Sequence, residues 1–178
     1  MKVLVAEKCG FCPGVRNAIK LAEKTLAQEK EVYCLGPIIH NEDVVCRLSE
    51  SGLKTIKSIE QIHSGTVLIR SHGATSKELD EIKRKSLKIV DATCVLVKRV
   101  QQIARKLNEE GYRAIIVGDK NHPEVKAVVG SAPDVRVVAG PEDLDNLRSN
   151  EKLGIICQTT QSPDYFAETV SAILKKGF

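Results

Sequence analysis

The sequence predicts an α/β protein with two similar units, each built on a parallel sheet. Continuous apolar runs of about four residues recur along the 178-residue chain, and amphipathic segments separate them. Such runs are typical of parallel strands buried on both faces, and apolar spacings of three and four are typical of helices. Their alternation favours doubly wound α/β architecture.

Strands are predicted in the first half at Val3–Ala6, Val32–Leu35, Val67–Arg70 and a run ending at Ile89-Val90. Apolar residues at 15, 18, 19, 22 and 26 predict a helix over Val15–Gln28. Asn41 is a capping signal for a helix that runs through Leu48 and stops at Gly52. The Thr75-Ser76-Lys77-Glu78 segment is a capping box that opens the next helix.

The second half repeats this order, with strands predicted at Ala114–Val117, Val135–Val138 and Leu153–Cys157. Its helices are predicted at Leu96–Asn108, from Pro123 to near Gly130, at Glu142–Leu147 and from the Ser162-Pro163 cap to Lys175. A boundary near Asp91–Cys94 separates the halves. We therefore expect an N-terminal strand and loop at residues 1–12, a first α/β domain at 13–92 and a second at 93–178.

The composition narrows the classes of function. Hydrophobic residues make up 42% of the chain, enough for a core, but Trp is absent and there are only three Phe and three Tyr. The net charge of +4 suits a small acidic substrate; a nucleic-acid binder would show a denser basic stripe with aromatics, so none is expected. Val3–Ala6 is too short for a signal peptide or a membrane span, which predicts a cytoplasmic protein. In the reducing cytoplasm, the six cysteines favour metal or redox chemistry over disulfide bonds.

Several residues able to do chemistry follow predicted strands. In open parallel sheets, ligands bind beyond the carboxyl ends of strands, where helix N-termini offer free N–H groups. The residues at such positions are Cys12, His40, His72, Cys94, His122 and Thr159. We expect them to face one cleft.

Two thiols stand out among the six. Cys9 and Cys12 form a C-x-x-C motif that suggests a dithiol oxidoreductase. The histidines and Cys94 favour the alternative, in which Cys9 is an apolar filler and only Cys12 takes part in chemistry. Beside Cys12, Cys94 becomes a candidate ligand for zinc or an iron–sulfur cluster. The remaining cysteines lie in strand or apolar helix patterns and are expected in the core: Cys34, Cys46 and Cys157. His63 lies in a polar loop and receives no role.

The histidines and one glutamate complete the inventory. Three histidines at strand ends indicate a site for an anion or a metal, without zinc-finger spacing. Glu124 lies one position inside a helix start, where a carboxylate is either a surface residue favoured by the helix dipole or a proton donor.

Taken together, the chain resembles the LytB/IspH family of 4-hydroxy-3-methylbut-2-enyl diphosphate reductases, which serve the non-mevalonate isoprenoid pathway. The resemblance rests on six motifs in order: Gly10-Phe11-Cys12-Pro13-Gly14-Val15, Gly36-Pro37-Ile38-Ile39-His40-Asn41, Arg70-Ser71-His72-Gly73, Asp91-Ala92-Thr93-Cys94, Gly118-Asp119 through His122-Pro123-Glu124-Val125, and Gln158-Thr159-Thr160. It implies a three-domain α/β architecture around a 4Fe–4S cluster held by three cysteines, and here the third domain is absent.

The resemblance also implies roles for single residues. Cys12 and Cys94 would be two cluster ligands, with the third cysteine missing from this chain. The three histidines, at positions 40, 72 and 122, would hold the substrate's diphosphate and hydroxyl ends. Glu124 would deliver the proton that lets the hydroxyl leave as water, and Thr159 would help to order that hydroxyl. Electrons would come from ferredoxin or flavodoxin, giving isopentenyl and dimethylallyl diphosphate.

Two departures from the family accompany this resemblance. Val95 stands where the family usually has Pro, which would loosen the loop holding Cys94, and the Val3–Ala6 strand would join the sheet of the missing domain. Three rival classes stay open: a zinc-binding Cys/His protein, a dithiol redox protein and a non-catalytic diphosphate-binding module.

Overall fold

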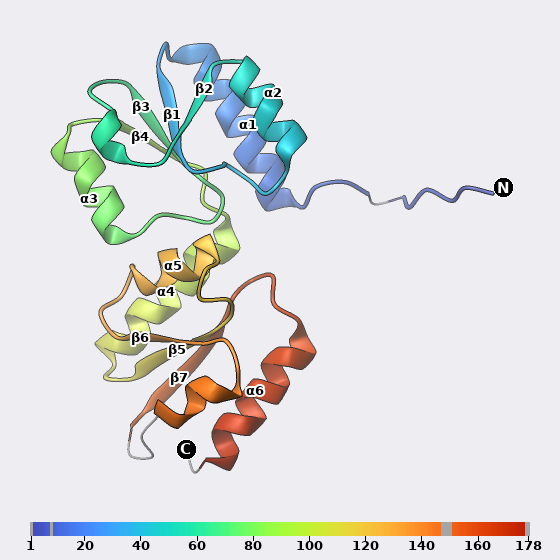
Figure 1. The fold of residues 1–178 in the computed structure, drawn as a ribbon, viewed down its shortest axis with the longest axis vertical. Helices are drawn as coiled ribbons and strands as arrows, with labels where there is room; N and C mark the ends of the chain where they lie inside the picture. Colours follow the sequence, from blue (N-terminus) through green and yellow to red (C-terminus); the bar gives the residue numbers. More distant parts are fainter. Residues whose placement is uncertain (1, 8, 147–150, 177–178) are drawn as a thin grey trace.

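The structure, a computed structural model, describes residues 2–7, 9–146 and 151–176 and confirms the α/β class. Two parallel sheets lie one beyond the other along the long axis of the molecule (Figure 1). The first has the order β2-β1-β3-β4 and comprises β1 (Val32–Leu35), β2 (Leu53–Ile56), β3 (Thr66–Ile69) and β4 (Lys88–Asp91). The second has the order β6-β5-β7 and comprises β5 (Arg113–Val117), β6 (Val135–Val138) and β7 (Leu153–Cys157).

The helices with a predicted capping residue begin directly after it. The helices are α1 (Pro13–Gln28), α2 (Glu42–Glu50), α3 (Ser76–Arg84), α4 (Val95–Glu109), α5 (Pro123–Val129) and α6 (Pro163–Lys175), with 3-10 turns η1 (Ile59–Gln61) and η2 (Pro141–Asn146). Asn41 Oδ1 accepts a hydrogen bond from the Val44 N–H at 3.0 Å, and Thr75 and Glu78 form the predicted capping box. These caps satisfy N–H groups that have no partner inside a helix. Among the described residues, no helix is both long and apolar enough to cross a membrane.

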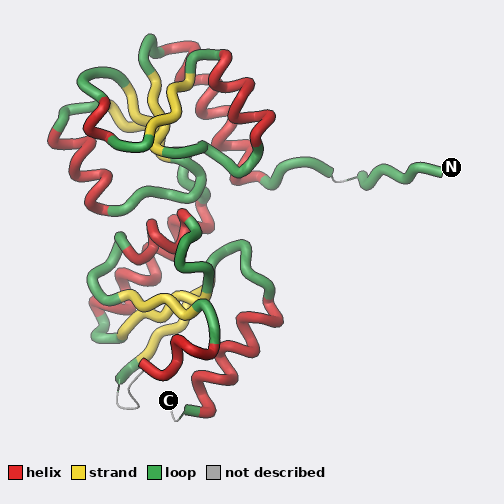
Figure 2. Tube along the Cα trace, viewed as in Figure 1, coloured by secondary structure: helices red, strands yellow, loops and turns green. Residues whose placement is uncertain are grey.

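Each sheet lies between two layers of helix, as Figure 2 shows. In the first unit, α1 and α2 cover one face of the sheet, while η1 and α3 cover the other. In the second unit, α4 and α5 cover one face, and α6 and η2 cover the other. Because both faces are buried, the strands carry continuous apolar runs, which is why the sequence pattern reveals them.

The prediction of a buried strand at Val3–Ala6 is wrong. This segment has no strand assignment and leads away from the body of the molecule (Figure 1), with Val3, Leu4 and Val5 exposed by 70%, 82% and 79%. A strand needs a neighbour for its backbone hydrogen bonds, and none of the described strands pairs with this segment.

Smaller differences also have physical reasons. The strand β2 and the turn η1 escaped prediction because the Leu53–Ile56 edge strand has only two apolar residues. Between residues 142 and 147 the structure has the η2 turn rather than a regular helix, and Leu147 lies outside the described residues. Cys34 is buried as expected, but the prediction that Cys46 belongs to the core is wrong because its side of α2 faces solvent.

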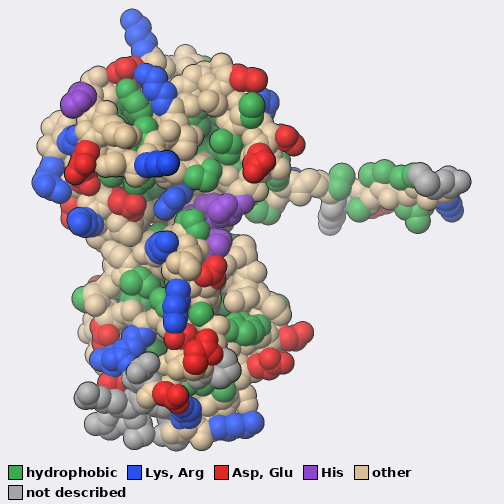
Figure 3. All heavy atoms as spheres, in the orientation of Figure 1, with side chains coloured by type: hydrophobic (Ala, Val, Ile, Leu, Met, Phe, Trp, Pro, Cys, Tyr) green, Lys and Arg blue, Asp and Glu red, His purple; other side chains and the backbone are tan. Residues whose placement is uncertain are grey.

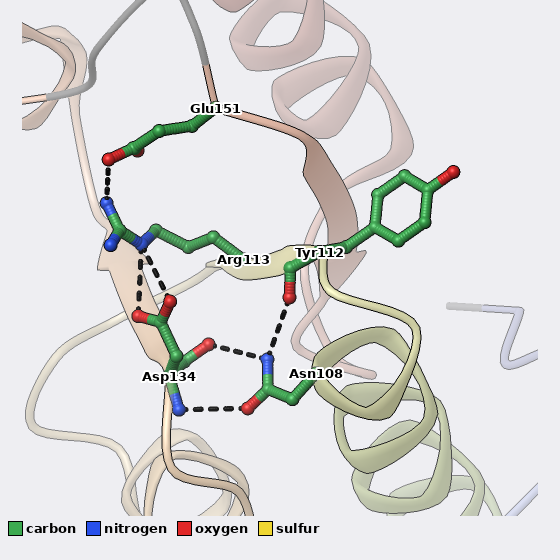
Figure 4. Close-up of polar contacts among 5 residues, drawn as sticks. All are labelled: Asn108, Tyr112, Arg113, Asp134 and Glu151. Carbon is green, nitrogen blue, oxygen red and sulfur yellow. Dashed lines mark hydrogen bonds and ion pairs between the residues drawn. The ribbon is translucent and has the colours of Figure 1, made fainter.

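The amino ends of the second sheet are tied together by a polar network, shown in Figure 4. Arg113 Nε donates to both carboxylate oxygens of Asp134 at 3.0 Å, and its Nη1 also pairs with Glu151. Asn108 donates to the carbonyls of Tyr112 and Asp134 at 3.0 and 2.8 Å. Arg113 begins β5, while Asp134 and Glu151 precede β6 and β7, so this network aligns the strands at the end opposite to the candidate site.

Candidate active site at the junction of the two sheets

Three histidines from both sheets converge at the junction. His40 follows β1 and His72 follows β3, whereas His122 follows β5 of the second sheet. The His40 and His72 ring centroids lie 4.3 Å apart, and each lies 5.5 Å from the His122 ring. Figure 3 shows histidine side chains gathered between the two units. Residues more than 80 positions apart in the chain thus form one cluster, the histidine trio.

Ser71 joins the loops of the first unit. Its N–H and its hydroxyl both donate to the Ile38 carbonyl, at 3.1 and 3.0 Å, and its own carbonyl accepts from the Cys94 N–H at 2.9 Å. Ser71 therefore fixes the loops that carry His40, His72 and Cys94 relative to one another. No role is predicted for Ser71 from the sequence, where its one signal is its position directly before His72.

Hydrogen bonding defines how the trio presents its nitrogens. The Glu124 N–H donates to His122 Nδ1 at 3.2 Å, which leaves Nε2 to carry the proton of the neutral ring. His72 Nδ1 is buried without a hydrogen-bond partner among the described residues. An unsatisfied buried nitrogen at the centre of a cluster indicates a position for a ligand.

Burial keeps the rings of His72 and His122 neutral. It lowers the pKa of His72 to about 4, helped by the nearby His40, His122 and Arg70. Burial also lowers the pKa of His122, against the opposing charges of Glu124 and Asp119. At neutral pH, His72 and His122 therefore act as uncharged donors and acceptors rather than as cations.

The low pKa of His72 predicts a loss of stability in acid. Because protonation is disfavoured in the folded state, the contribution is complete above the ordinary pKa of 6.5 and is lost as the pH falls toward 4. We expect about 1 kcal/mol less stability at pH 5 than at pH 7.5 from this group, because its partial exposure screens the effect to about half of its full size. Urea unfolding at both pH values measures it.

The variant His72→Asn should flatten this pH dependence, while His63→Asn, at an exposed histidine, should preserve it. An NMR titration that places the His72 midpoint at 6 or above would contradict the prediction.

Arg70 supplies a permanent positive charge beside the trio. Its Nε donates to the Gly73 carbonyl at 3.4 Å, and a Cβ on Gly36 would stand 2.7 Å from its Nη1. Gly36, with φ +72°, is thus the residue that leaves room for the guanidinium. Arg70 forms none of the ion pairs found among the described residues. Arg70 belongs to the Arg70-Ser71-His72-Gly73 motif, but no role is predicted for it from the sequence.

Glu124 and Thr159 are held together. Glu124 is only 1% exposed, and its two carboxylate oxygens accept from the Thr159 N–H at 2.7 Å and from the Thr159 hydroxyl at 2.8 Å. Gln158 ties the same loops, since its Oε1 accepts from the Asp119 N–H at 3.0 Å. The acid group predicted from the sequence therefore lies beside His122, with its orientation fixed.

Cys12 and Cys94 lie close to each other at helix starts. They are the N-cap residues of α1 and α4, and neither makes a side-chain capping bond. A Cβ on Gly14 would stand 2.7 Å from the Cys94 sulfur and 3.9 Å from the Cys12 sulfur. Two free thiols around a bare glycine, at two positive helix ends, fit an anionic metal–sulfur group. Despite Val95, α4 begins directly after Cys94.

No other described cysteine completes a set of three. Burial raises the pKa of Cys34 to about 12. Burial and the Glu124 charge raise the pKa of Cys157, which is half-buried. Cys46 lines a groove of about 730 Å³ beside His40. Cys9 is an exposed free thiol in the N-terminal segment.

Comparisons with known proteins agree with one another. A family model described as LytB protein matches residues 3–177. The 4-hydroxy-3-methylbut-2-enyl diphosphate reductase of Geobacter metallireducens is 44% identical over 99% of this chain and 63% of its own length. That of Pelobacter propionicus is 42% identical over 99% of this chain and 64% of its own length.

Two solved structures have the same fold. The Plasmodium falciparum E-1-hydroxy-2-methyl-but-2-enyl-4-diphosphate reductase gives a TM-score of 0.89 at 32% identity, over 94% of this chain and 54% of its own. The second is described as (E)-4-hydroxy-3-methyl-but-2-enyl diphosphate reductase, the terminal enzyme of the non-mevalonate pathway. It gives a TM-score of 0.85 at 40% identity, over 97% of this chain and 63% of its own. The chain thus spans a little under two thirds of the length of the curated relatives.

Proposed function

The chain belongs to the LytB protein family, and we propose that it forms two α/β domains, residues 13–92 and 93–178, of a 4-hydroxy-3-methylbut-2-enyl diphosphate reductase. The reaction would run in the cytoplasm and remove the hydroxyl of this substrate as water, with two electrons and two protons. The observation that carries the proposal is the meeting of the histidine trio with the Glu124–Thr159 pair at one junction.

The trio would bind the diphosphate. Neutral imidazoles donate N–H groups to phosphate oxygens, and the Arg70 guanidinium adds the positive charge that the neutral rings lack. Since His122 Nδ1 already accepts from the Glu124 N–H, its Nε2–H is the group left to face the anion. Two of the three rings come from one sheet and the third from the other, so a bound diphosphate would bridge the two domains.

Glu124 would be the proton donor. In its acid form it holds a proton within a buried site, and Thr159 keeps the carboxyl in one orientation. Thr159, an exposed residue whose hydroxyl donates to Glu124, would help to orient the hydroxyl of the substrate. A proton delivered there allows the C–O bond to break with water as the leaving group.

Cys12 and Cys94 would hold two irons of a 4Fe–4S cluster, and a third thiolate would come from outside residues 1–178. When bound, such a cluster supplies electrons singly, from ferredoxin or flavodoxin, and offers an open iron to the substrate hydroxyl. The protein's share is the pair of thiols at two helix N-termini and the space left by Gly14.

Anaerobic reconstitution tests the proposal. This chain, with two of three thiolates, should hold iron and sulfide weakly, whereas a preparation carrying the relatives' remaining length should show a stable, oxygen-sensitive cluster spectrum. Cys12→Ser and Cys94→Ser should abolish the cluster there, and Cys46→Ser should not. A colourless protein that retains zinc instead would overturn the assignment, and a stable cluster on residues 1–178 would place its third ligand at Cys9 or Cys157.

A further inference from the structure

The histidine trio has the composition of a metal site as well as of an anion site. Each of the three rings offers one nitrogen, and these ligand atoms all lie within 4.8 Å of one another. In tetrahedral coordination, metal–nitrogen bonds of about 2.0–2.1 Å put ligand nitrogens about 3.4 Å apart. Closing the trio on an ion therefore needs movements of about 1 Å, which the exposed ring of His40 can supply.

We propose that His40, His72 and His122 bind one first-row divalent transition ion, such as Zn²⁺ or Co²⁺, with the fourth position open. Three imidazoles are the ligand set that these ions prefer, and an open position is typical of sites that exchange ligands. The inference stands on the placement of the rings and holds whether or not the chain acts as a reductase.

Two buried contacts indicate which nitrogens are available. His72 Nδ1 is buried and lacks a hydrogen-bond partner among the described residues, so an ion would satisfy it. His122 Nδ1 accepts from the Glu124 N–H at 3.2 Å, so the proton of the neutral ring lies on Nε2. A metal at Nε2 would require this proton to move to Nδ1 and the hydrogen bond from Glu124 to break.

The charges around the trio select the kind of ion. Arg70 opposes any cation, while the carboxylates of Asp119 and Glu124 act on His122 in the opposite sense. An ion held only by charge, such as Mg²⁺ or Ca²⁺, prefers oxygen ligands and gains nothing from imidazoles. Ions that form strong bonds to nitrogen are the ones that fit.

A bound ion would occupy the nitrogens that the proposed function assigns to the diphosphate. Free Zn²⁺ would therefore act as a competitor of the anion at this junction. Because the two ligands have opposite charges, Arg70 should favour the diphosphate and disfavour the metal.

Co²⁺ and Zn²⁺ titrations test the inference, by visible absorption and by calorimetry. A background with Cys9, Cys12, Cys46 and Cys94 changed to Ser removes competing thiols. We expect one equivalent of Co²⁺ with the visible bands of tetrahedral nitrogen coordination and without thiolate charge-transfer absorption. His72→Ala should weaken binding by at least tenfold, and the matched control His63→Ala should leave it unchanged.

The variant Arg70→Gln should change the affinities for the metal ion and for the anion in opposite directions. Losing this positive charge should tighten Zn²⁺ several-fold and weaken inorganic pyrophosphate several-fold. Unchanged metal affinity in His72→Ala, or no binding at millimolar metal, would overturn the inference, as would weaker Zn²⁺ binding in Arg70→Gln. If the four-Ser background does not fold, paramagnetic broadening of the three imidazole proton signals by Co²⁺ decides the question in the unmodified chain.

Discussion

Glu124→Gln is expected to lower turnover by about 10²–10⁴-fold in the proposed reductase, while cluster content and diphosphate affinity stay close to those of the parent. The amide has the size of the carboxyl group. Its oxygen can still accept from the Thr159 N–H, and its NH₂ can donate to the Thr159 hydroxyl, so the contacts now at 2.7 and 2.8 Å would persist. Only the acidic proton is lost.

Steady-state kinetics with iron and sulfide measured for each variant test this prediction. The work requires a preparation that carries the relatives' remaining length and a bound cluster. Glu109→Gln, at an exposed glutamate near the end of α4, serves as the control and should retain parental turnover. Near-parental kcat in Glu124→Gln would remove this carboxyl from the mechanism and leave it as a helix-start residue favoured by the dipole.

Gly130→Ala is expected to weaken pyrophosphate binding by about tenfold and to lower turnover by up to about 10²-fold, the scale of a 1 Å misplacement. Gly130 ends α5, and a Cβ there would stand 2.5 Å from Thr75 Cγ2 and 2.6 Å from Thr75 Cβ. Its carbonyl accepts from the Ser76 N–H at 3.0 Å. Since α5 starts at His122 and Thr75 follows the His72 loop, this contact sets how the two domains present their histidines.

The cause is steric, because Gly130 has φ −74°, a conformation open to any residue. Thr75→Gly in the Gly130→Ala background removes the clashing atoms and should restore affinity, since glycine is a tolerable N-cap. Gly154→Ala is the matched control: its Cβ would meet Leu107 at 2.3 Å, within the second unit. Gly154→Ala should lower thermal stability without changing pyrophosphate affinity. An equal loss of affinity in both variants would show that Gly130→Ala acts through general destabilisation and not through the placement of the histidines.

Local signals in the sequence determined most of the secondary structure. Capping residues such as Asn41 and Thr75 act within four positions of themselves, so their helices could be placed before any fold was known. Apolar runs such as Ala114–Val117 report strands buried on both faces. Where a strand is at an edge, as in β2, this signal fades and the prediction failed.

The parallel sheets also made part of the site predictable. Because carboxyl ends of parallel strands share an edge, His40 and His72 could be assigned to one place from their positions after strands. The same argument assigned His122 and Thr159, which follow β5 and β7, to that cleft. The catalytic and binding roles of these residues stay predictions.

Only the tertiary structure decided which of these groups touch. His122 approaches His40 and His72 where Gly130 lies against Thr75, a residue 55 positions away in the chain. Arg70 and Ser71 gain their importance from neighbours supplied by other loops. Val3–Ala6 has a strand's composition, but no strand in the described part of the chain pairs with it. Local patterns encode the propensity of a segment, whereas pairing, packing and charge around a group depend on residues far away in the chain.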